Sequence, residues 1–233
     1  MCSEYCLTST LPKRLNRVEG HCLYSLSSVL RGEGWGEGPG QQVDFIFRWF
    51  DVGDIVKQRP VLLIAAVFSR QSSALDWARA RFAAEWGNIA LESPRFDHRE
   101  TTYYEKSMGP DLQKMFLASE TLVDPGTLPE LKLQANRWED EYRATHSHEE
   151  PRPLNIDPGY ITEAKLVLAS TKDRDHRIYL AQGIFAEVTL HFARGAWQTR
   201  PWTYPDYQRA DYHEFFIRCR EYLRGRYRSV AHD

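Results

Sequence analysis

Residues with the capacity for chemistry are concentrated between positions 155 and 207. Asp157 stands directly before Pro158–Gly159, a dipeptide that is typical of turns with a fixed backbone shape. Such a turn would present the Asp157 carboxylate rigidly for acid–base catalysis, with the ring of Tyr160 beside it as a ligand contact. An Asx turn that only links two elements is the simpler alternative.

A loop before a predicted strand brings cations, an acid and an imidazole together. Lys172, Asp173, His176 and Arg177 lie within a few residues of one another. Lysine and arginine bind anionic groups such as phosphates, and imidazole transfers protons near neutral pH. The loop is therefore a candidate site with His176 as a catalytic group. A charged, solvated loop without a ligand is the alternative.

A carboxylate and an imidazole share one face of a predicted strand. Glu187 and His191 are four residues apart, and because strand neighbours alternate, both should point away from the apolar residues Ile184, Ala186, Val188 and Leu190. The pair could move a proton, with Glu187 as a catalytic residue, or could bind a divalent metal. A solvent-facing side of a sheet needs polar residues in any case.

Two prolines stiffen a loop with three aromatic side chains and one acid, Pro201-Trp-Thr-Tyr-Pro-Asp-Tyr207. Trp202 and Tyr204 could stack on a base or a sugar, with Asp206 as a further ligand contact. A plug over the edge of the domain is an equal alternative. A similar mixture of acids and phenols surrounds Tyr104, which we also predict to contact the ligand.

Several well-defined motifs are absent. The sequence has no phosphate-binding loop, no nucleophile elbow, no H-E-x-x-H pair and no Rossmann glycine pattern. Arg174 stands where a guanine-reading T-K-x-D motif would place its acid. A conventional GTPase is thereby excluded.

Composition narrows the class of protein further. The 30 Lys and Arg residues nearly balance the 32 Asp and Glu residues, which argues against a dedicated nucleic-acid binder. The longest apolar run, Val61–Phe68, is much shorter than the roughly 20 residues of a membrane-spanning helix, so no membrane association is expected. The N-terminus lacks the residue order of a signal peptide, which predicts a cytoplasmic protein.

The elements that must position these residues follow from hydrophobic periodicity. The apolar run at 61–68 predicts a central strand covered on both faces. Ser72–Ser73 are predicted to cap a helix that Gly87 ends. Thr127 and Glu130 have capping-box spacing for a second helix to about residue 145. Further strands are predicted at 89–95, 114–119 and 154–156.

These elements give an α+β fold in which residues 60–157 follow the β-α-β-β-α-β order of ferredoxin-like domains. Residues 162–170 suit either a short helix or a strand. After Arg177, alternating apolar residues and turn signals at Gln182–Gly183 and Arg194–Gly195 predict an antiparallel meander. A final helix with a buried Cys219 completes the fold.

The first part of the chain differs from the rest. Residues 31–40 form a Gly-dense run that offers little to pack, so we predict that residues 1–55 are a disordered extension. The run also resembles translation of a GC-rich intergenic repeat, which would place the true start near Val52. The alternative is that Phe45-Ile-Phe-Arg-Trp-Phe50 forms a short strand or an interaction peptide. Residues 56–228 are predicted to form a single α+β domain.

Strings spread along most of the chain resemble the bacterial and archaeal domain-of-unknown-function-4416 family. The resemblance spans about residues 57–224 and leaves the first 55 residues outside it. The charged and aromatic residues in the loops of this pattern imply a polar binding or catalytic site more than residues that serve only the packing of the core. The strings are Tyr103-Tyr-Glu-Lys106, Asn155-Ile-Asp-Pro-Gly-Tyr160, Lys165-Leu-Val-Leu-Ala169, Thr171-Lys-Asp173, His176-Arg-Ile-Tyr179, Ala186-Glu-Val-Thr189 and Trp202-Thr-Tyr-Pro-Asp-Tyr207.

The leading hypothesis is a small-molecule site for a nucleotide or another phosphorylated ligand, in a binding protein or an enzyme. Lys172 and Arg177 would meet anionic groups, and Tyr204 and Trp202 would stack on a base or sugar. The sequence names no cofactor, although a divalent metal is compatible with the site. An RNA-binding module, disfavoured by the near-neutral charge, and a partner-binding subunit without catalysis are the alternatives.

Overall fold

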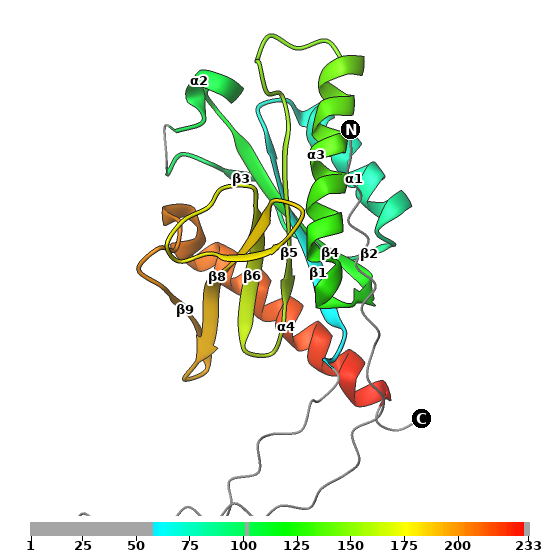
Figure 1. Ribbon diagram of the computed structural model, residues 1–233, viewed down its shortest axis with the longest axis vertical. Coiled ribbons are helices and arrows are strands. Elements are labelled where there is room, and N and C mark those ends of the chain that lie inside the picture. The colour runs from blue at the N-terminus through cyan, green and yellow to red at the C-terminus, as the bar shows by residue number, and fades with distance from the viewer. Residues whose placement is uncertain (1–57, 101–102, 231–233) are drawn as a thin grey trace, which may run out of the picture. The chain divides into compact units, whose positions relative to one another are not determined.

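The structure, a computed structural model, describes residues 58–100 and 103–230. Its strands are β1 (Val61–Ser69), β2 (Ile89–Glu92), β3 (Phe96–Asp97), β4 (Gln113–Val123), β5 (Asn155–Ile161), β6 (Lys165–Ser170), β7 (Ile178–Ala181), β8 (Ile184–Ala193) and β9 (Ala196–Thr199). They form one antiparallel sheet in the order β2-β4-β1-β5-β6-β8-β7, with β3 beside β4 and β9 beside β8 (Figure 1). The fold is therefore α+β, as predicted.

β1 is the central strand of this sheet. All nine of its residues are buried, and β4 and β5 pair with its two edges. Because side chains alternate along a strand, Leu62 packs into one apolar cluster and Leu63 into another on the opposite face. The prediction of a central strand covered on both faces is confirmed.

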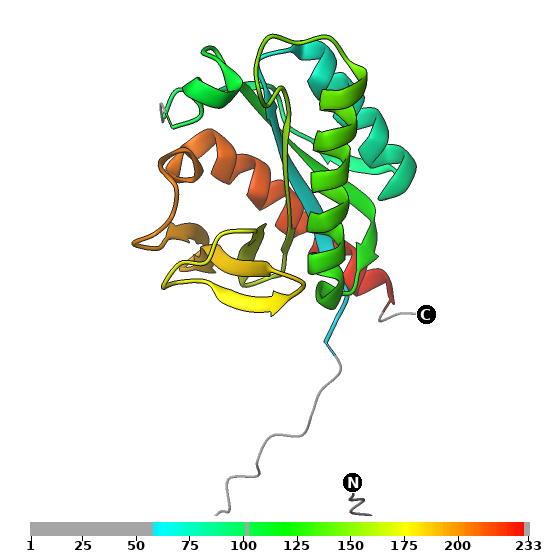
Figure 2. The ribbon, with the colours of Figure 1, turned by 45° about the horizontal axis from the view of Figure 1, so that its top comes forward.

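The helices cover the two faces of the sheet. They are α1 (Ser72–Glu85), α2 (Glu105–Met108), α3 (Leu128–Thr145) and α4 (Ala210–Val230), with 3₁₀ turns at Pro125–Thr127 and Pro205–Gln208. α1 and α3 pack on one face, and the long α4 crosses the other (Figures 1 and 2). The predicted periodicities at 72–86 and 127–145 correspond to α1 and α3.

Both predicted helix caps differ from the observed ones. Ser72–Ser73 lie inside α1, and the N–H of the preceding Gln71 instead donates to Ser69 Oγ at 2.9 Å. Thr127 makes no side-chain cap on α3, because the turn before the helix is capped by Asp124. The termination of α1 is as predicted, since Gly87 takes the left-handed φ of +95°.

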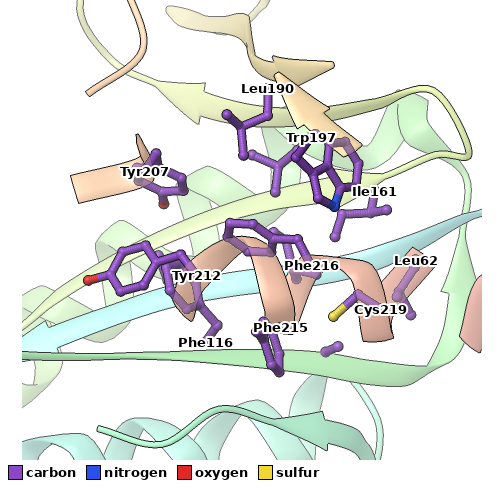
Figure 3. Close-up of a cluster of buried hydrophobic side chains, with 14 of the residues drawn as sticks. Leu62, Phe116, Ile161, Leu190, Trp197, Tyr207, Tyr212, Phe215, Phe216 and Cys219 are labelled. Carbon is purple, nitrogen blue, oxygen red and sulfur yellow. The ribbon is translucent and has the colours of Figure 1, made fainter. Parts of the chain in front are cut away.

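α4 carries the apolar face that its periodicity predicts. Tyr212, Phe216 and Cys219 are fully buried on it (Figure 3). The ring of Phe116 from β4 packs between them, with its centroid 4.7 Å from that of Tyr212 and 4.9 Å from that of Phe216. This aromatic cluster joins the final helix to the centre of the sheet.

The predicted turn at Pro158–Gly159 is wrong, because both residues lie inside β5. They pair with Ala65 and Ile64 of β1, so the chain runs straight through the dipeptide. A Cβ on Gly159 would lie 2.2 Å from the carbonyl oxygen of Val167 in β6. Glycine is needed here for the close approach of two strands and not for a turn.

The structure after β5 decides between a helix and a strand at residues 162–170 and tests the predicted meander. Residues 165–170 are the strand β6 and not a helix. The two predicted hairpin turns form, and Gln182–Gly183 and Arg194–Gly195 all have positive φ. β7 and β9 lie along the same edge of β8, because β6 pairs with its other edge. The predicted meander is therefore two hairpins that share β8.

No helix in the described part of the chain is long and apolar enough to cross a membrane. The predictions for residues 1–55, disorder or a downstream start, lie outside the described residues and stay predictions.

Candidate ligand-binding pocket

A pocket opens where β5 and β6 diverge. These strands pair only from Gly159 to Ile161 on β5, whereas Asn155–Pro158 pair with β1. The resulting cavity has a volume of about 510 Å³ and is bordered by both strands, by the loop after β6 and by the loop after β9. This volume lies within the range of small-molecule sites in proteins.

The pocket brings most of the predicted site residues together. Asp173 and Tyr160 are the exceptions: Asp173 is exposed in its loop, and Tyr160 packs toward the apolar cluster around Val167. Tyr160 is three residues from Asp157, and side chains at odd spacing point to opposite faces of a strand. The predicted residues that line the pocket are Tyr104, Asp157, Lys172, His176, Arg177, Glu187, Trp202, Tyr204 and Asp206.

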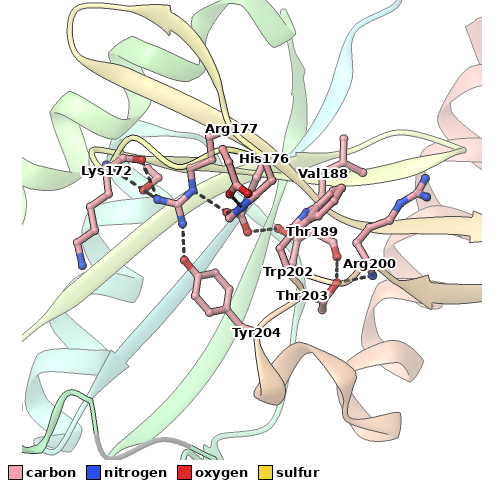
Figure 4. A network of polar contacts seen from close by, with 12 residues as sticks. Lys172, His176, Arg177, Val188, Thr189, Arg200, Trp202, Thr203 and Tyr204 are labelled. Atoms are coloured by element: carbon pink, nitrogen blue, oxygen red, sulfur yellow. Dashed lines mark hydrogen bonds and ion pairs between the residues drawn. The ribbon is translucent and has the colours of Figure 1, made fainter.

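Arg177 is the hub of one wall of the pocket. Its Nε donates to Glu187 Oε2 at 2.8 Å, and one of its Nη atoms donates to the Tyr204 hydroxyl at 2.6 Å (Figure 4). Its other Nη donates to Ser170 Oγ and to the carbonyl of Lys172. Four of its five N–H groups are thus bound by the protein, so Arg177 organises the wall and has little capacity left for an anionic ligand.

His176 adds a titratable group to the same wall. Its Nε2 lies 3.2 Å from Glu187 Oε2, and its ring stacks on Trp202 at a centroid distance of 5.3 Å. The Trp202 indole N–H donates to the carbonyl of Val188 at 3.0 Å, which orients the stack. An imidazole held by a carboxylate is an arrangement that suits proton transfer.

Hydrogen bonds fix the aromatic loop after β9 against β8. Thr203 Oγ1 donates to the carbonyl of Thr189 at 2.6 Å and accepts from the N–H of Arg200 at 2.7 Å. The Thr189 hydroxyl in turn donates to Glu187 Oε1 at 3.2 Å. The loop and the buried carboxylate are therefore parts of one hydrogen-bonded network.

The predicted pairing of Glu187 with His191 is wrong. The register of β8 against β6 shifts between Val188 and Leu190, which leaves one extra residue on β8. A bulge of this kind reverses the alternation of side chains. Leu190 consequently packs in the cluster under α4, whereas Val188 packs in the cluster beside α3, and His191 lies outside the pocket.

Asp157 is held by two neighbours. Lys132 of α3 donates to its Oδ1 at 2.9 Å, and Asn155 donates to its Oδ2 at 2.7 Å. Burial alone would raise the pKa of this carboxyl group, but the charge and hydrogen bond of Lys132 outweigh burial and lower the pKa. Asp157 is therefore ionised at neutral pH, and both of its oxygens have protein partners.

A second polar cluster forms the floor of the pocket and consists of His98, Lys114, Asp206 and Tyr207. The Lys114 ammonium donates to Asp206 Oδ2 at 2.6 Å and lies 4.3 Å from the centroid of the Tyr207 ring. His98 Nδ1 is 3.7 Å from the same Asp206 oxygen. All four residues are buried, in contrast to the exposed rim around Lys172.

Cations outnumber carboxylates in the pocket lining. Six Lys and Arg side chains line it against four Asp and Glu side chains. At the rim, Lys172 Nζ donates to the Tyr103 hydroxyl at 2.9 Å, and this contact lowers the pKa of the phenol. No three His, Cys, Asp or Glu side chains within residues 58–100 and 103–230 gather closely enough to hold a metal ion.

Comparison with known protein families matches residues 59–222 to the family described as Domain of unknown function (DUF4416). The chain belongs to this family. The match agrees with the extent of the resemblance that the sequence strings indicate. A search of the curated proteins finds no match to the chain.

Several pocket residues of this DUF4416 domain were missed by sequence reasoning. Lys114 lies in the apolar strand β4, and Lys132 lies on the buried stripe of α3, four residues after Leu128. In both cases a lysine stands at a position where the periodicity of the element predicts a buried apolar residue, and this mismatch could have marked it as a pocket residue. His98, Arg152 and Arg174 lie in loops, where no local pattern marks them.

Proposed function

We propose that the pocket binds a small phosphorylated ligand, such as a nucleotide or a sugar phosphate. The observation that carries this proposal is a pair of exposed cations at the rim, Lys172 and Arg174. Neither makes an ion pair with any residue in 58–100 or 103–230, although both line the pocket. Cations without carboxylate partners in a concave site are suited to phosphate groups.

The aromatic side chains beside these cations support a ligand with a flat or ring-shaped part. Trp202 and Tyr204 are 36% and 41% exposed although they belong to an anchored loop. The stack of Trp202 on His176 and the bond of Tyr204 to Arg177 hold both rings in place. Rigid, exposed aromatic surfaces of this kind stack on bases and sugars.

The proposed catalytic role is strongest for His176. Its Nε2 lies 3.2 Å from the carboxylate of Glu187, and its side chain is partly exposed beside the cavity. We propose Glu187 and Asp157 as groups that position and charge-balance the site, because each is already held by a cation. His176→Phe keeps a ring to stack on Trp202, so loss of turnover with retained ligand binding would separate catalysis from binding.

The experiment that tests the proposal is a thermal-shift panel on the full chain. The panel contains nucleotides, sugar phosphates, divalent metals and short single-stranded RNAs. A ligand present at about a thousandfold over its Kd adds about 4 kcal/mol to the free energy of unfolding. Lys172→Ala and Arg174→Ala should each weaken binding about tenfold or more, whereas Lys165→Ala, an exposed lysine outside the pocket, should not.

The alternative functions predict other outcomes of the same panel. A shift with RNA alone would favour an RNA-binding module. No shift with any ligand, together with one co-purifying protein in constant ratio, would favour a partner-binding subunit. Either result would contradict the phosphorylated-ligand proposal.

We also infer that residues 60–161 form a ferredoxin-like unit within the larger sheet. The order of the chain there is β1, α1, β2, β4, α3 and β5, with the short β3 before β4. The adjacent strands are β2-β4-β1-β5, and every pair among them is antiparallel. Both features support the inference. Comparison of an experimental structure with known ferredoxin-like domains would test it.

A further inference from the structure

The floor of the pocket has hydrogen-bonding capacity that the protein leaves unused. Both ring nitrogens of His98 are buried and have no hydrogen-bond partner in the described chain. Beside this ring, Asp206 Oδ1 and the Tyr207 hydroxyl make no hydrogen bond to a residue in 58–100 or 103–230. Buried polar groups are nearly always satisfied in folded proteins, so an imidazole that lines a cavity with two buried, unsatisfied nitrogens indicates a binding surface.

The floor offers donors and acceptors together. The Lys114 ammonium uses one N–H for Asp206, which leaves two N–H groups as donors. Burial and the charge of Lys114 lower the pKa of His98, so its ring is neutral near pH 7 and keeps one donor and one acceptor nitrogen. Burial raises the pKa of the Tyr207 phenol, which therefore keeps its O–H proton.

This mixture is poorly suited to a second phosphate. Asp206 is paired with Lys114 and lies 3.7 Å from His98 Nδ1, and Glu100 Oε2 is 3.6 Å from the same nitrogen. The two carboxylates leave the floor without the excess of cations that a phosphate group needs. A hydroxyl group is neutral and donates and accepts at the same time, so it matches both Asp206 and the neighbouring donors.

We propose that the floor of the pocket binds the hydroxyl groups of a phosphorylated sugar whose phosphate is held at the rim. This inference rests on the proposed function and narrows its ligand class. The sugar is either that of a simple sugar phosphate or the ribose of a nucleotide, since both present the same hydroxyl chemistry. The rim cations supply affinity for phosphate, and the floor supplies the preference for a hydroxylated carbon skeleton.

The test compares three probes on the full chain by isothermal titration calorimetry. Ribose 5-phosphate and glucose 6-phosphate carry hydroxyl groups, whereas butyl phosphate carries the same phosphate without them. At least one sugar phosphate should bind about tenfold or more tightly than butyl phosphate, as expected for two or more hydrogen bonds. A ribonucleotide and the matching 2′,3′-dideoxynucleotide form a second pair that identifies a ribose source.

His98→Phe is the variant that tests the floor. Phenylalanine keeps the ring contacts with Phe68 and Tyr104 and removes two buried nitrogens without partners, so the variant should fold. We expect it to lose much of the preference for the sugar phosphate while butyl phosphate binds as before. Asp206→Asn, which removes the charge but keeps the shape, should reduce the same preference.

The outcomes separate the two proposals. If sugar phosphates and butyl phosphate bind equally to the unaltered chain, or if the preference survives in both His98→Phe and Asp206→Asn, the inference about the floor is wrong. The phosphate proposal would then stand. If none of the phosphorylated probes binds, the proposed function itself is wrong. Lys172→Ala should weaken all phosphorylated probes by a similar factor, which distinguishes the rim from the floor.

Discussion

Arg177 and Glu187 form the most deeply buried ion pair beside the pocket rim. Their side chains are 4% and 2% exposed, and their Nε and Oε2 atoms are 2.8 Å apart. A buried carboxylate that loses its cation keeps its desolvation cost without compensation. The pair therefore couples the stability of β8 to the shape of the pocket wall.

Arg177→Ala is expected to lower the free energy of unfolding by about 3–5 kcal/mol. Arg143→Ala is the matched control, because Arg143 and Asp140 are 53% and 67% exposed and such pairs contribute about 0–1 kcal/mol. Urea unfolding of both variants provides the measurement. Equal losses in the two variants would show that the buried pair stabilises the fold no more than the exposed pair does.

His98 should make stability depend on pH. Burial and Lys114 lower its pKa from 6.5, Arg209 acts in the same direction, and Asp206 and Glu100 oppose them. As pH falls below 6.5, the unfolded chain takes up the proton before the folded chain does, so the free energy of unfolding decreases. The stabilising contribution is present above that pH and is lost below it.

The measurement is urea unfolding of the unaltered chain and of His98→Phe at several values between about pH 8 and pH 5. The unaltered chain should lose stability relative to the variant as pH falls. Groups other than His98 titrate in both proteins, and their effects cancel in the difference. Parallel curves would show that His98 keeps its ordinary pKa in the folded state.

At the scale of elements, the pocket exists because β1 pairs with the whole of β5, whereas β6 pairs only with its last three residues. The first residues of β5 pair with β1 alone, and β6 joins only at Gly159. Pro158, which has no N–H to donate, stands where this change occurs. The absence of a side chain on Gly159 lets the backbone of Val167 approach closely and brings the two strands together at one end of the opening.

Gly159→Ala should therefore destabilise the protein by several kcal/mol, because the added Cβ would meet a backbone carbonyl oxygen at 2.2 Å and the strands must separate. Gly225→Ala is the control, since a Cβ there meets nothing within 4 Å and the residue lies within α4. It should stabilise the protein by about 1 kcal/mol. Thermal unfolding of both variants tests the pair. A neutral Gly159→Ala would contradict the close approach of β5 and β6.

At the scale of the whole molecule, all strands of the described residues belong to one continuous sheet. β1 contributes to the apolar clusters on both faces, so the packing of α4 and that of α1 and α3 depend on the same strand. Residues far apart in the sequence are in contact, as in the hydrogen bond between Lys114 and Asp206, which are 92 residues apart in the chain. Cooperative unfolding is the expected consequence.

A chain of residues 54–233 should accordingly unfold in a single transition. Far-ultraviolet circular dichroism and tryptophan fluorescence should report the same midpoint in urea, because both clusters are lost when β1 is lost. The full chain serves as the comparison. Two separate midpoints in the shorter chain would contradict the prediction of a single domain in this region.

Local patterns were sufficient to predict the elements whose type follows from the spacing of their own apolar and turn residues. The apolar run of β1, the stripe of α4 and the Gly183 and Gly195 turns each follow from a few adjacent residues. The strand β5 was misread at Pro158–Gly159, because the demand for glycine there comes from β6 and not from the local backbone. The bulge in β8 was missed for the same kind of reason, since the register depends on its partner strand.

The sequence by itself determined the α+β class, the family and the segments rich in site candidates, because hydrophobic periodicity and short residue strings are local properties of the chain. Only the tertiary structure decided which candidates share a pocket. In the structure, Arg177 and Asp157 are bound by other residues of the protein. Tyr160 and Asp173 lie outside the pocket, whereas His98 and Lys114 line it. Whether the assembled residues bind a ligand stays a prediction. The physical reason for the division is that strand pairing joins residues far apart in the chain, and no local pattern specifies which strands diverge to leave a cavity.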